Sequence, residues 1–187
     1  MVSSQVEETT LEQESALLVD FVNTREIETQ VDEISSPKAL EKWIAASDVG
    51  IGAPNVEAAG HRRVLALREA LRALLRANNG GVAVPADVVA LHEACARARY
   101  RASIGPDAVL RIDPDGDGLD AFEERLVLAI ERVQALGGWA RLKACTAEDC
   151  QWAFIDSSRN RSRTWCSMDV CGNRSKTRRY RSRRARG

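Results

Sequence analysis

Apolar residues recur every three or four positions along two long segments of the chain, residues 61–77 and 119–136. This spacing places them on one face of a helix, so we predict two amphipathic helices, each ended by a pair of glycines. The arginines of the first segment, Arg68 and Arg72 among them, fall mostly on its other faces, which predicts a polar surface there. The apolar positions are Val64, Leu67, Leu71, Leu74 and Leu75 in the first helix, and Leu119, Phe122, Leu126, Ile130 and Val133 in the second.

Weaker patterns predict further elements around these helices. Ser36 followed by Pro37 is typical of a helix start, with serine as the N-cap and proline at the first helical position. Another helix is predicted over residues 85–100, and residues 107–112 fit a short strand. The apolar block at 16–22 fits either a helix or a buried strand, because so short a run has no decisive period. The pattern as a whole predicts a mainly α protein.

The composition agrees with a folded protein. The chain has 187 residues, of which 44% are hydrophobic, enough to bury a core. No apolar run of the sequence approaches the roughly 20 residues that a membrane helix needs, so we expect no membrane partner. The acidic first residues lack the basic-then-apolar order of a secretory signal, and we therefore expect a cytoplasmic location. In that compartment, closely spaced cysteines more often bind metal than form disulfides.

The net charge of zero conceals a strong division along the chain. Residues 1–138 contain 14 Lys and Arg against 23 Asp and Glu, a net charge of −9, whereas residues 139–187 contain 13 against 4, a net charge of +9. A basic segment beside an acidic one favours an anionic partner, most often nucleic acid, although a basic surface that meets only solvent has the same composition. We predict a flexible segment at 1–14, a helical regulatory domain with one short hairpin at 15–138, and a small basic domain at 139–187.

Four cysteines of the basic segment are spaced as two pairs. Each pair encloses four residues, and fifteen residues separate the pairs. This spacing is typical of a zinc site with four cysteine ligands. The alternatives are an iron–sulfur site and cysteines that are simply buried without a metal. Four thiolates fill the tetrahedron around Zn²⁺, so we predict one structural zinc ion and no catalytic metal. The predicted ligands are Cys145, Cys150, Cys166 and Cys171.

The residues between and after the cysteines predict a treble-clef-like zinc finger of knuckle, β-hairpin and basic helix. Residues 152–155 and 163–165 are the expected strands of the hairpin. Ser167 is a suitable N-cap for the helix, and Asp169 suits the positive end of the helix dipole. Cys171 would then project from the first helical turn.

Basic and amide side chains gather around the predicted zinc site, on the loop after the first strand and along the helix. Arginine matches phosphate oxygens and the guanine edge, and asparagine can pair with adenine or with phosphate. We therefore predict duplex DNA as the partner. The predicted contacts are Arg159, Asn160, Arg161, Arg163, Asn173, Arg174, Lys176, Arg178, Arg179 and Arg181.

Several short segments of this region closely resemble the CGNR zinc-finger family. They include both cysteine pairs and the tetrapeptide Cys-Gly-Asn-Arg at residues 171–174. The preceding part is similar to the ABATE domain, which usually precedes this finger, in its Phe-Val-Asn-Thr block at 21–24 and in its order of helices. The resemblance implies a bacterial stress-induced transcription regulator whose finger binds DNA. The segments that carry the finger resemblance are residues 141–145, 150–156, 158–163, 165–168 and 171–174.

Other interpretations fit the same residues. The finger would bind RNA if its aromatic residues stack on bases, or it would dock onto an acidic protein surface. The acidic domain would bind a small-molecule effector, self-associate, or hold the basic finger in cis when no DNA is present.

Two further chemistries have less support. Residues 113–124 match the calcium-loop pattern D-x-D-x-D-G-x5-E, but a strand instead of a helix is predicted before them, so we expect no specific calcium site. The two histidines, His61 and His92, belong to no catalytic motif, and we expect no enzyme activity.

Overall fold

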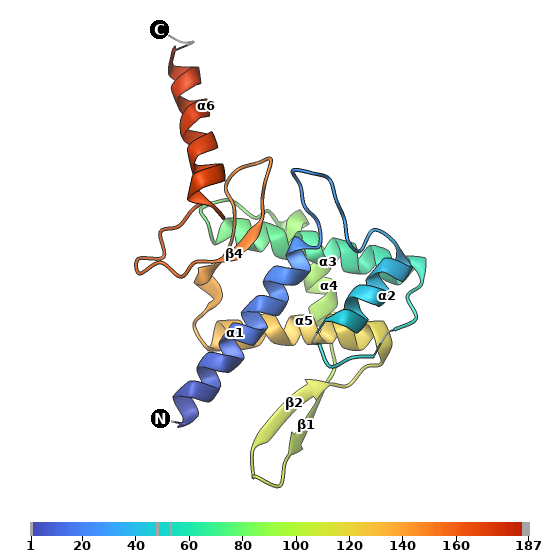
Figure 1. Ribbon diagram of the computed structural model, residues 1–187. Coiled ribbons are helices and arrows are strands. Elements are labelled where there is room, and N and C mark those ends of the chain that lie inside the picture. Colours follow the sequence, from blue (N-terminus) through green and yellow to red (C-terminus); the bar gives the residue numbers. More distant parts are fainter. Residues whose placement is uncertain (1, 48, 53, 185–187) are drawn as a thin grey trace.

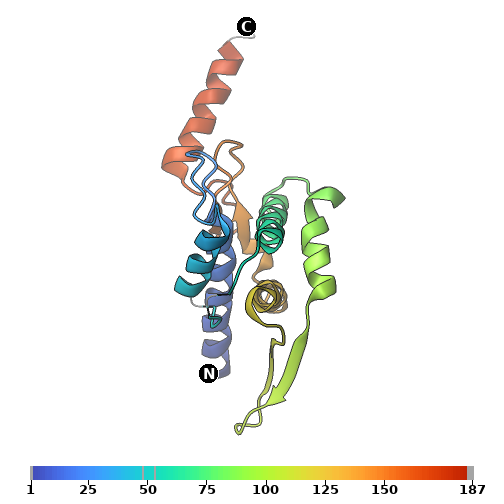
Figure 2. The same ribbon diagram turned by 90° about the vertical axis from the view of Figure 1, so that its right-hand side faces the viewer.

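The helices α1 to α5 pack in three layers (Figure 2). The computed structural model describes residues 2–47, 49–52 and 54–184 (Figure 1). No helix among these residues is both long enough and apolar enough to cross a membrane. α1 (Val2–Asn23) and α2 (Pro37–Ala46) form one outer layer, α3 (Ala58–Ala77) and α5 (Gly118–Ala135) form the middle layer, and α4 (Val89–Arg97) forms the other outer layer.

The two long amphipathic helices are confirmed as α3 and α5. Their predicted apolar positions are buried in one core, with the exception of Leu74, which is half-buried. Three aromatic side chains join the layers, because the Phe21 ring lies 6.0 Å from that of Trp43 and 5.7 Å from that of Phe122. The start of α2 is also confirmed, since the Ser36 hydroxyl accepts a hydrogen bond from the N–H of Ala39.

The apolar block at 16–22 is helical, and α1 extends well into the segment that we expected to be flexible. Glu14 is only 3% exposed, and its carboxylate bonds to Arg125 at 2.6 Å and to Arg132 at 2.9 Å. These two arginines lie on α5, more than 100 positions further along the chain, so no local pattern around Glu14 indicates that it is paired.

A β-hairpin projects from the helical layers at the end opposite to α6 (Figure 1). Its strands are β1 (Tyr100–Ile104) and β2 (Leu110–Pro114), which pair antiparallel. The strand predicted at 107–112 is therefore present with a shifted start. It precedes the calcium-like turn, and the buried Glu124 caps that turn by accepting hydrogen bonds from the N–H groups of Arg99, Asp115 and Gly116 at 2.8–3.1 Å.

The β-hairpin of the basic segment is formed by a different pair of strands from the pair that we predicted. β4 (Ala153–Ile155) pairs with β3 (Leu142–Ala144), whereas residues 163–165 form no strand. The reason is burial, because Leu142, Ala144 and Ala153 belong to the same core as the helices. The short 3-10 segments at Pro85–Val88 and Trp139–Arg141 connect elements before α4 and β3.

The structure also corrects the prediction of a polar face on α3, because Arg68 and Arg72 are 1% and 3% exposed. Arg68 forms two parallel hydrogen bonds with the Asp32 carboxylate, at 2.8 and 2.9 Å. Arg72 donates to the backbone carbonyls of Val22 and Gln151, at 2.7 and 3.0 Å. A charged group can be buried when it is paired and hydrogen-bonded in this way. These two arginines fix the loop after α1 and the start of β4.

Candidate metal centre and nucleic-acid interface

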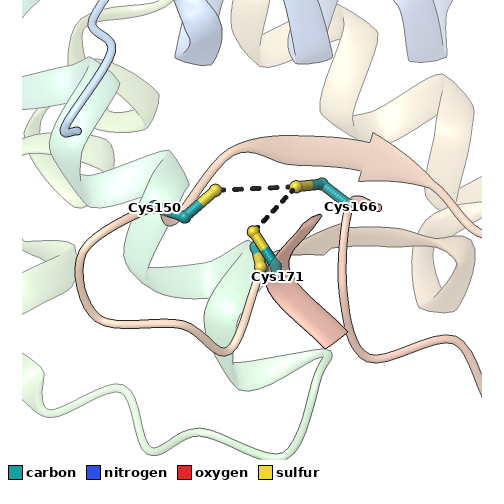
Figure 3. Close-up of side chains that lie close together, drawn as sticks. Cys150, Cys166 and Cys171 are labelled. Carbon is teal, nitrogen blue, oxygen red and sulfur yellow. Dashed lines mark hydrogen bonds between the residues drawn. The ribbon is translucent and has the colours of Figure 1, made fainter. Parts of the chain in front are cut away.

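The four predicted zinc ligands come together in one cluster. Their sulfur atoms all lie within 4.8 Å of one another. The sulfur of Cys166 is 3.5 Å from that of Cys150 and 3.7 Å from that of Cys171 (Figure 3). Tetrahedral Zn–S bonds of about 2.3 Å place the sulfurs about 3.8 Å apart. The donor set and its spacing therefore fit one zinc ion with no position left for water, so the ion would be structural.

The backbone around the first cysteine pair folds into a knuckle. The N–H of Cys145 donates to the carbonyl of Trp152 at 2.9 Å, and the N–H groups of Cys150 and Gln151 both donate to the carbonyl of Ala147, at 3.0 and 3.1 Å. Gln151 has a φ of 52°, the left-handed conformation that closes the turn. Cys145 and Cys150 thereby point their sulfurs at the same place.

The second cysteine pair is positioned by a helix start, as predicted. The Ser167 hydroxyl accepts a hydrogen bond from the N–H of Val170 at 3.3 Å. The first turn, Met168–Gly172, is a π-helical turn that carries the buried Cys171, and α6 (Asn173–Arg184) follows it directly. The metal centre therefore fixes the N-terminal end of the basic helix.

Close packing and burial shift the pKa values of the thiols of Cys145, Cys150 and Cys166. A hydrogen bond from Cys150 lowers the pKa of the Cys145 thiol to about 5, and the same bond raises the pKa of Cys150. Burial raises the pKa of Cys166 to about 11. Zinc binds cysteine as the thiolate, so binding of the ion would release the protons of the thiols.

A buried ion pair organises the loop between the two cysteine pairs. The Asp156 side chain is fully buried and that of Lys143 is 6% exposed, and they bond at 2.7 Å. The Asp156 carboxylate also accepts hydrogen bonds from Ser158 and from the N–H of Arg163, at 2.5–3.0 Å. Lys143 donates further to the backbone carbonyl of Arg161 at 2.6 Å. This arrangement shapes the loop 157–163, which carries four of the predicted nucleic-acid contacts.

The predicted nucleic-acid contacts occupy different environments. Arg163 lies 4.8 Å from the centre of the Phe154 ring and donates to the carbonyls of Trp165 and Cys166, so it supports the loop. The amide of Asn173 donates to the carbonyl of Asp169 at 3.1 Å. The side chain of Arg179 lies outside the described residues. The side chains of Arg159, Asn160, Arg161, Lys176 and Arg181 are exposed.

Two arginines of α6 bind carboxylates. Arg174 bonds to Glu28 of the loop after α1 at 2.6 Å and approaches the Cys171 sulfur at 3.5 Å. Arg178 bonds to Asp149 of the knuckle at 2.6 Å, and Arg174 lies 3.6 Å from the same carboxylate.

Three asparagines attach the finger to the helical layers, a role that the sequence pattern does not predict for them. Asn79 donates to the carbonyls of Ala144 and Thr164, both at 2.8 Å, and Asn78 donates to those of Trp139 and Leu142 at 2.9 and 3.0 Å. In the sequence these asparagines signal only the end of α3. On α1, Asn23 makes a reciprocal pair with the backbone of Ala153, at 2.8 and 3.0 Å.

Together these features define a mainly α protein that carries a zinc finger with four cysteine ligands beside a basic helix. Two family comparisons agree with this class. Residues 15–144 match the ABATE family, described as a putative stress-induced transcription regulator, and residues 141–184 match the CGNR zinc finger. The chain belongs to the ABATE family, and its finger is of the CGNR type, so both resemblances seen in the sequence are confirmed. Neither family is of an enzymatic kind, and no curated protein matches the chain.

Proposed function

We propose that residues 139–187 bind duplex DNA through the loop 157–163 and α6, and that the ABATE domain regulates this binding as part of transcriptional control. The observation that carries the proposal is a set of exposed cations on the loop and helix of the finger that have no ion-pair partner among the described residues. They are Arg159, Arg161, Lys176 and Arg181.

The shape of the finger supports this proposal. α6 projects away from the helical layers, with its first turn held at the metal centre (Figure 1). Its 12 residues extend about 18 Å at about 1.5 Å per residue. The major groove of B-form DNA is about 12 Å wide and admits a helix of this kind. The loop 157–163 belongs to the same finger, so its arginines would meet phosphates flanking the groove.

The contact between Glu28 and Arg174 supports regulation in cis. Glu28 lies on the loop that the buried pair of Arg68 and Asp32 fixes, and it bonds to the arginine closest to the metal centre. A phosphate or a base edge would compete with this carboxylate for the same guanidinium. The acidic domain would thus lower the affinity of the finger for DNA until the contact is released.

The salt dependence of binding tests the proposal. Fluorescence anisotropy of a labelled mixed-sequence duplex would be measured between 50 and 200 mM salt, where log affinity falls by about 0.9 per log salt for each phosphate neutralised. Contacts from four cations give a slope near about −4. Arg181→Ala should reduce the slope by about one, whereas Lys38→Ala, an exposed lysine on α2, should leave it unchanged.

Three results would count against duplex DNA. A slope near zero with unchanged affinity in Arg181→Ala would remove this surface as the contact. Equal affinity for a hairpin RNA would favour RNA as the partner. Failure to bind either polynucleotide at low salt would favour an acidic protein surface.

A further inference from the structure

An open cavity of about 670 Å³ is lined by residues of α1, of α2 and of the zinc finger. Its wall includes Asp20 of α1, Glu33 of the following loop and Trp43 of α2, and Trp152 of the finger also lines it. This volume falls within the range of about 300–1,000 Å³ that is typical of small-molecule sites. The cavity is separate from the surface assigned to DNA.

The carboxylates of the cavity have no counter-charge of their own. Neither Asp20 nor Glu33 makes a side-chain hydrogen bond or ion pair with the described residues. Burial raises the pKa of Asp20, which is the expected effect on a carboxylate that is partly desolvated. Arg125 also reaches the cavity, but it is bound at 2.6 Å by the buried carboxylate of Glu14. The cavity therefore presents excess negative charge to a ligand.

The two indoles lie beside fixed neighbours. Trp43 packs edge-on against Phe122, with the ring centres 6.1 Å apart. Trp152 is 38% exposed, and the residues on both sides of it are fixed, because Arg72 bonds to the carbonyl of Gln151 and Asn23 pairs with the backbone of Ala153. Indole rings fixed beside unpaired carboxylates attract cations through the electron density of their faces.

From this geometry we propose that the cavity binds a small organic cation, an amine or ammonium group attached to an apolar body. The indoles would contact the apolar body and the cationic group, and Asp20 and Glu33 would supply the counter-charge. Because Trp152 lies two residues after Cys150, which is a predicted zinc-binding cysteine, the bound organic cation would contact the finger directly. An effect of the ligand on DNA affinity rests on the proposed function, whereas binding of the cation does not.

Binding of matched probes to the zinc-loaded full chain tests the proposal. Phenethylamine, 2-phenylethanol and phenylacetate have similar size and carry a positive, zero and negative charge. Tryptophan fluorescence and calorimetry should show saturable binding of the amine, at least ten-fold weaker binding of the alcohol and no binding of the acid. Equal affinity for the amine and the alcohol, or no saturable binding of the amine, would overturn the proposal.

Two near-isosteric variants locate the site. Neither Asp20 nor Glu33 makes a side-chain hydrogen bond or ion pair with the described residues, so Asp20→Asn and Glu33→Gln should preserve the fold. Each should weaken amine binding at least three-fold. Glu57→Gln, an exposed carboxylate at the start of α3, is the matched control and should bind the amine as the parent does. If Glu57→Gln weakened amine binding as much as Asp20→Asn, the amine would be attracted by the overall negative charge of the domain, and the proposed site would be wrong. None of these measurements involves DNA, so failure here would leave the proposed function standing.

Discussion

The buried pair of Lys143 and Asp156 should be the most sensitive ion pair of the finger. We consider Asp156→Asn, which keeps the shape of the side chain and removes its charge. Burial alone would raise the pKa of Asp156, but the bonds from Lys143, Ser158 and the Arg163 N–H lower it below its ordinary value. The folded finger therefore stabilises the carboxylate form, and an amide cannot replace it.

The expected magnitude follows from what remains after the change. Removal of one partner from a buried ion pair costs about 3–5 kcal/mol, because the other charge stays buried. Lys143 retains the carbonyls of Arg161 and Arg163, at 2.6 and 3.2 Å, so the lower end of that range applies, about 3 kcal/mol. In the parent, Lys143, Ser158 and the Arg163 N–H donate hydrogen bonds to the Asp156 carboxylate at 2.5–3.0 Å. The NH₂ group of the new amide would face one set of these donors and could accept no hydrogen bond from them. The equilibrium constant of unfolding should therefore rise by about two orders of magnitude.

Urea unfolding at neutral pH with zinc present measures this change. Asp107→Asn is the matched control, because Asp107 pairs with Arg111 at 2.5 Å on the hairpin β1–β2 with both side chains about half exposed. Hydrogen bonds from Arg111 lower the pKa of Asp107 as well, yet solvent screens that pair and the control should not measurably change stability. Equal stability of Asp156→Asn and the parent, or an equal loss in the control, would refute the reasoning.

The remaining predictions concern the metal, the cis contact and pH. Elemental analysis should find one zinc per chain. Cys166→Ser should increase hydrogen exchange after residue 155 while α3 and α5 stay protected, because the metal supplies most of the folding energy of the residues after 155. Loss of all helicity in this variant would contradict the prediction. Glu28→Gln should raise duplex affinity about two- to five-fold, the scale of an exposed ion pair, and an unchanged affinity would remove the cis contact as a regulator. Arg174→Ala should cost about 1–3 kcal/mol on a preferred sequence and less on random DNA, and equal losses on both would rule out base reading by Arg174. The stability difference between Asp156→Asn and the parent should be constant from pH 8 to 6 and should shrink only below about pH 4. The reason is that the pKa of Asp156 is lower in the folded protein than in the unfolded chain, so its carboxylate stabilises the fold until the pH falls low enough to protonate it. A difference that already shrinks at pH 6 would contradict this assignment.

The parts of the fold that could be predicted from the sequence are those with a local cause. The apolar period of α3 and α5, the N-caps at Ser36 and Ser167, and the spacing of the cysteine pairs each lie within fewer than thirty residues of the chain. These signals predicted the helices, the start of the finger helix and the metal ligands. The strand pairing of the finger was predicted wrongly, because β3 is chosen by burial against α3 and not by a hairpin pattern.

The parts that could not be predicted depend on partners far apart in the chain. Charged residues on a helix usually face solvent, so Arg68 and Arg72 were assigned to a polar face. They are buried because Asp32 and several backbone carbonyls, among them that of Gln151, supply their partners. Glu14 is paired across the layers in the same way. The cavity proposed to bind an organic cation is likewise lined by α1, α2 and the finger, so no continuous segment of the sequence contains it.

The hydrogen bonds that four side chains of the helical layers make to the finger all go to its main chain. Asn23, Asn78, Asn79 and Arg72 all bond to backbone groups of the finger, and none of these bonds depends on which side chain the finger residue carries. Substitution of the exposed loop and helix residues therefore leaves this anchorage intact. Under the proposed function, a graft of loop 157–163 and α6 from a related finger should therefore change the preferred DNA sequence without a redesign of the helical layers.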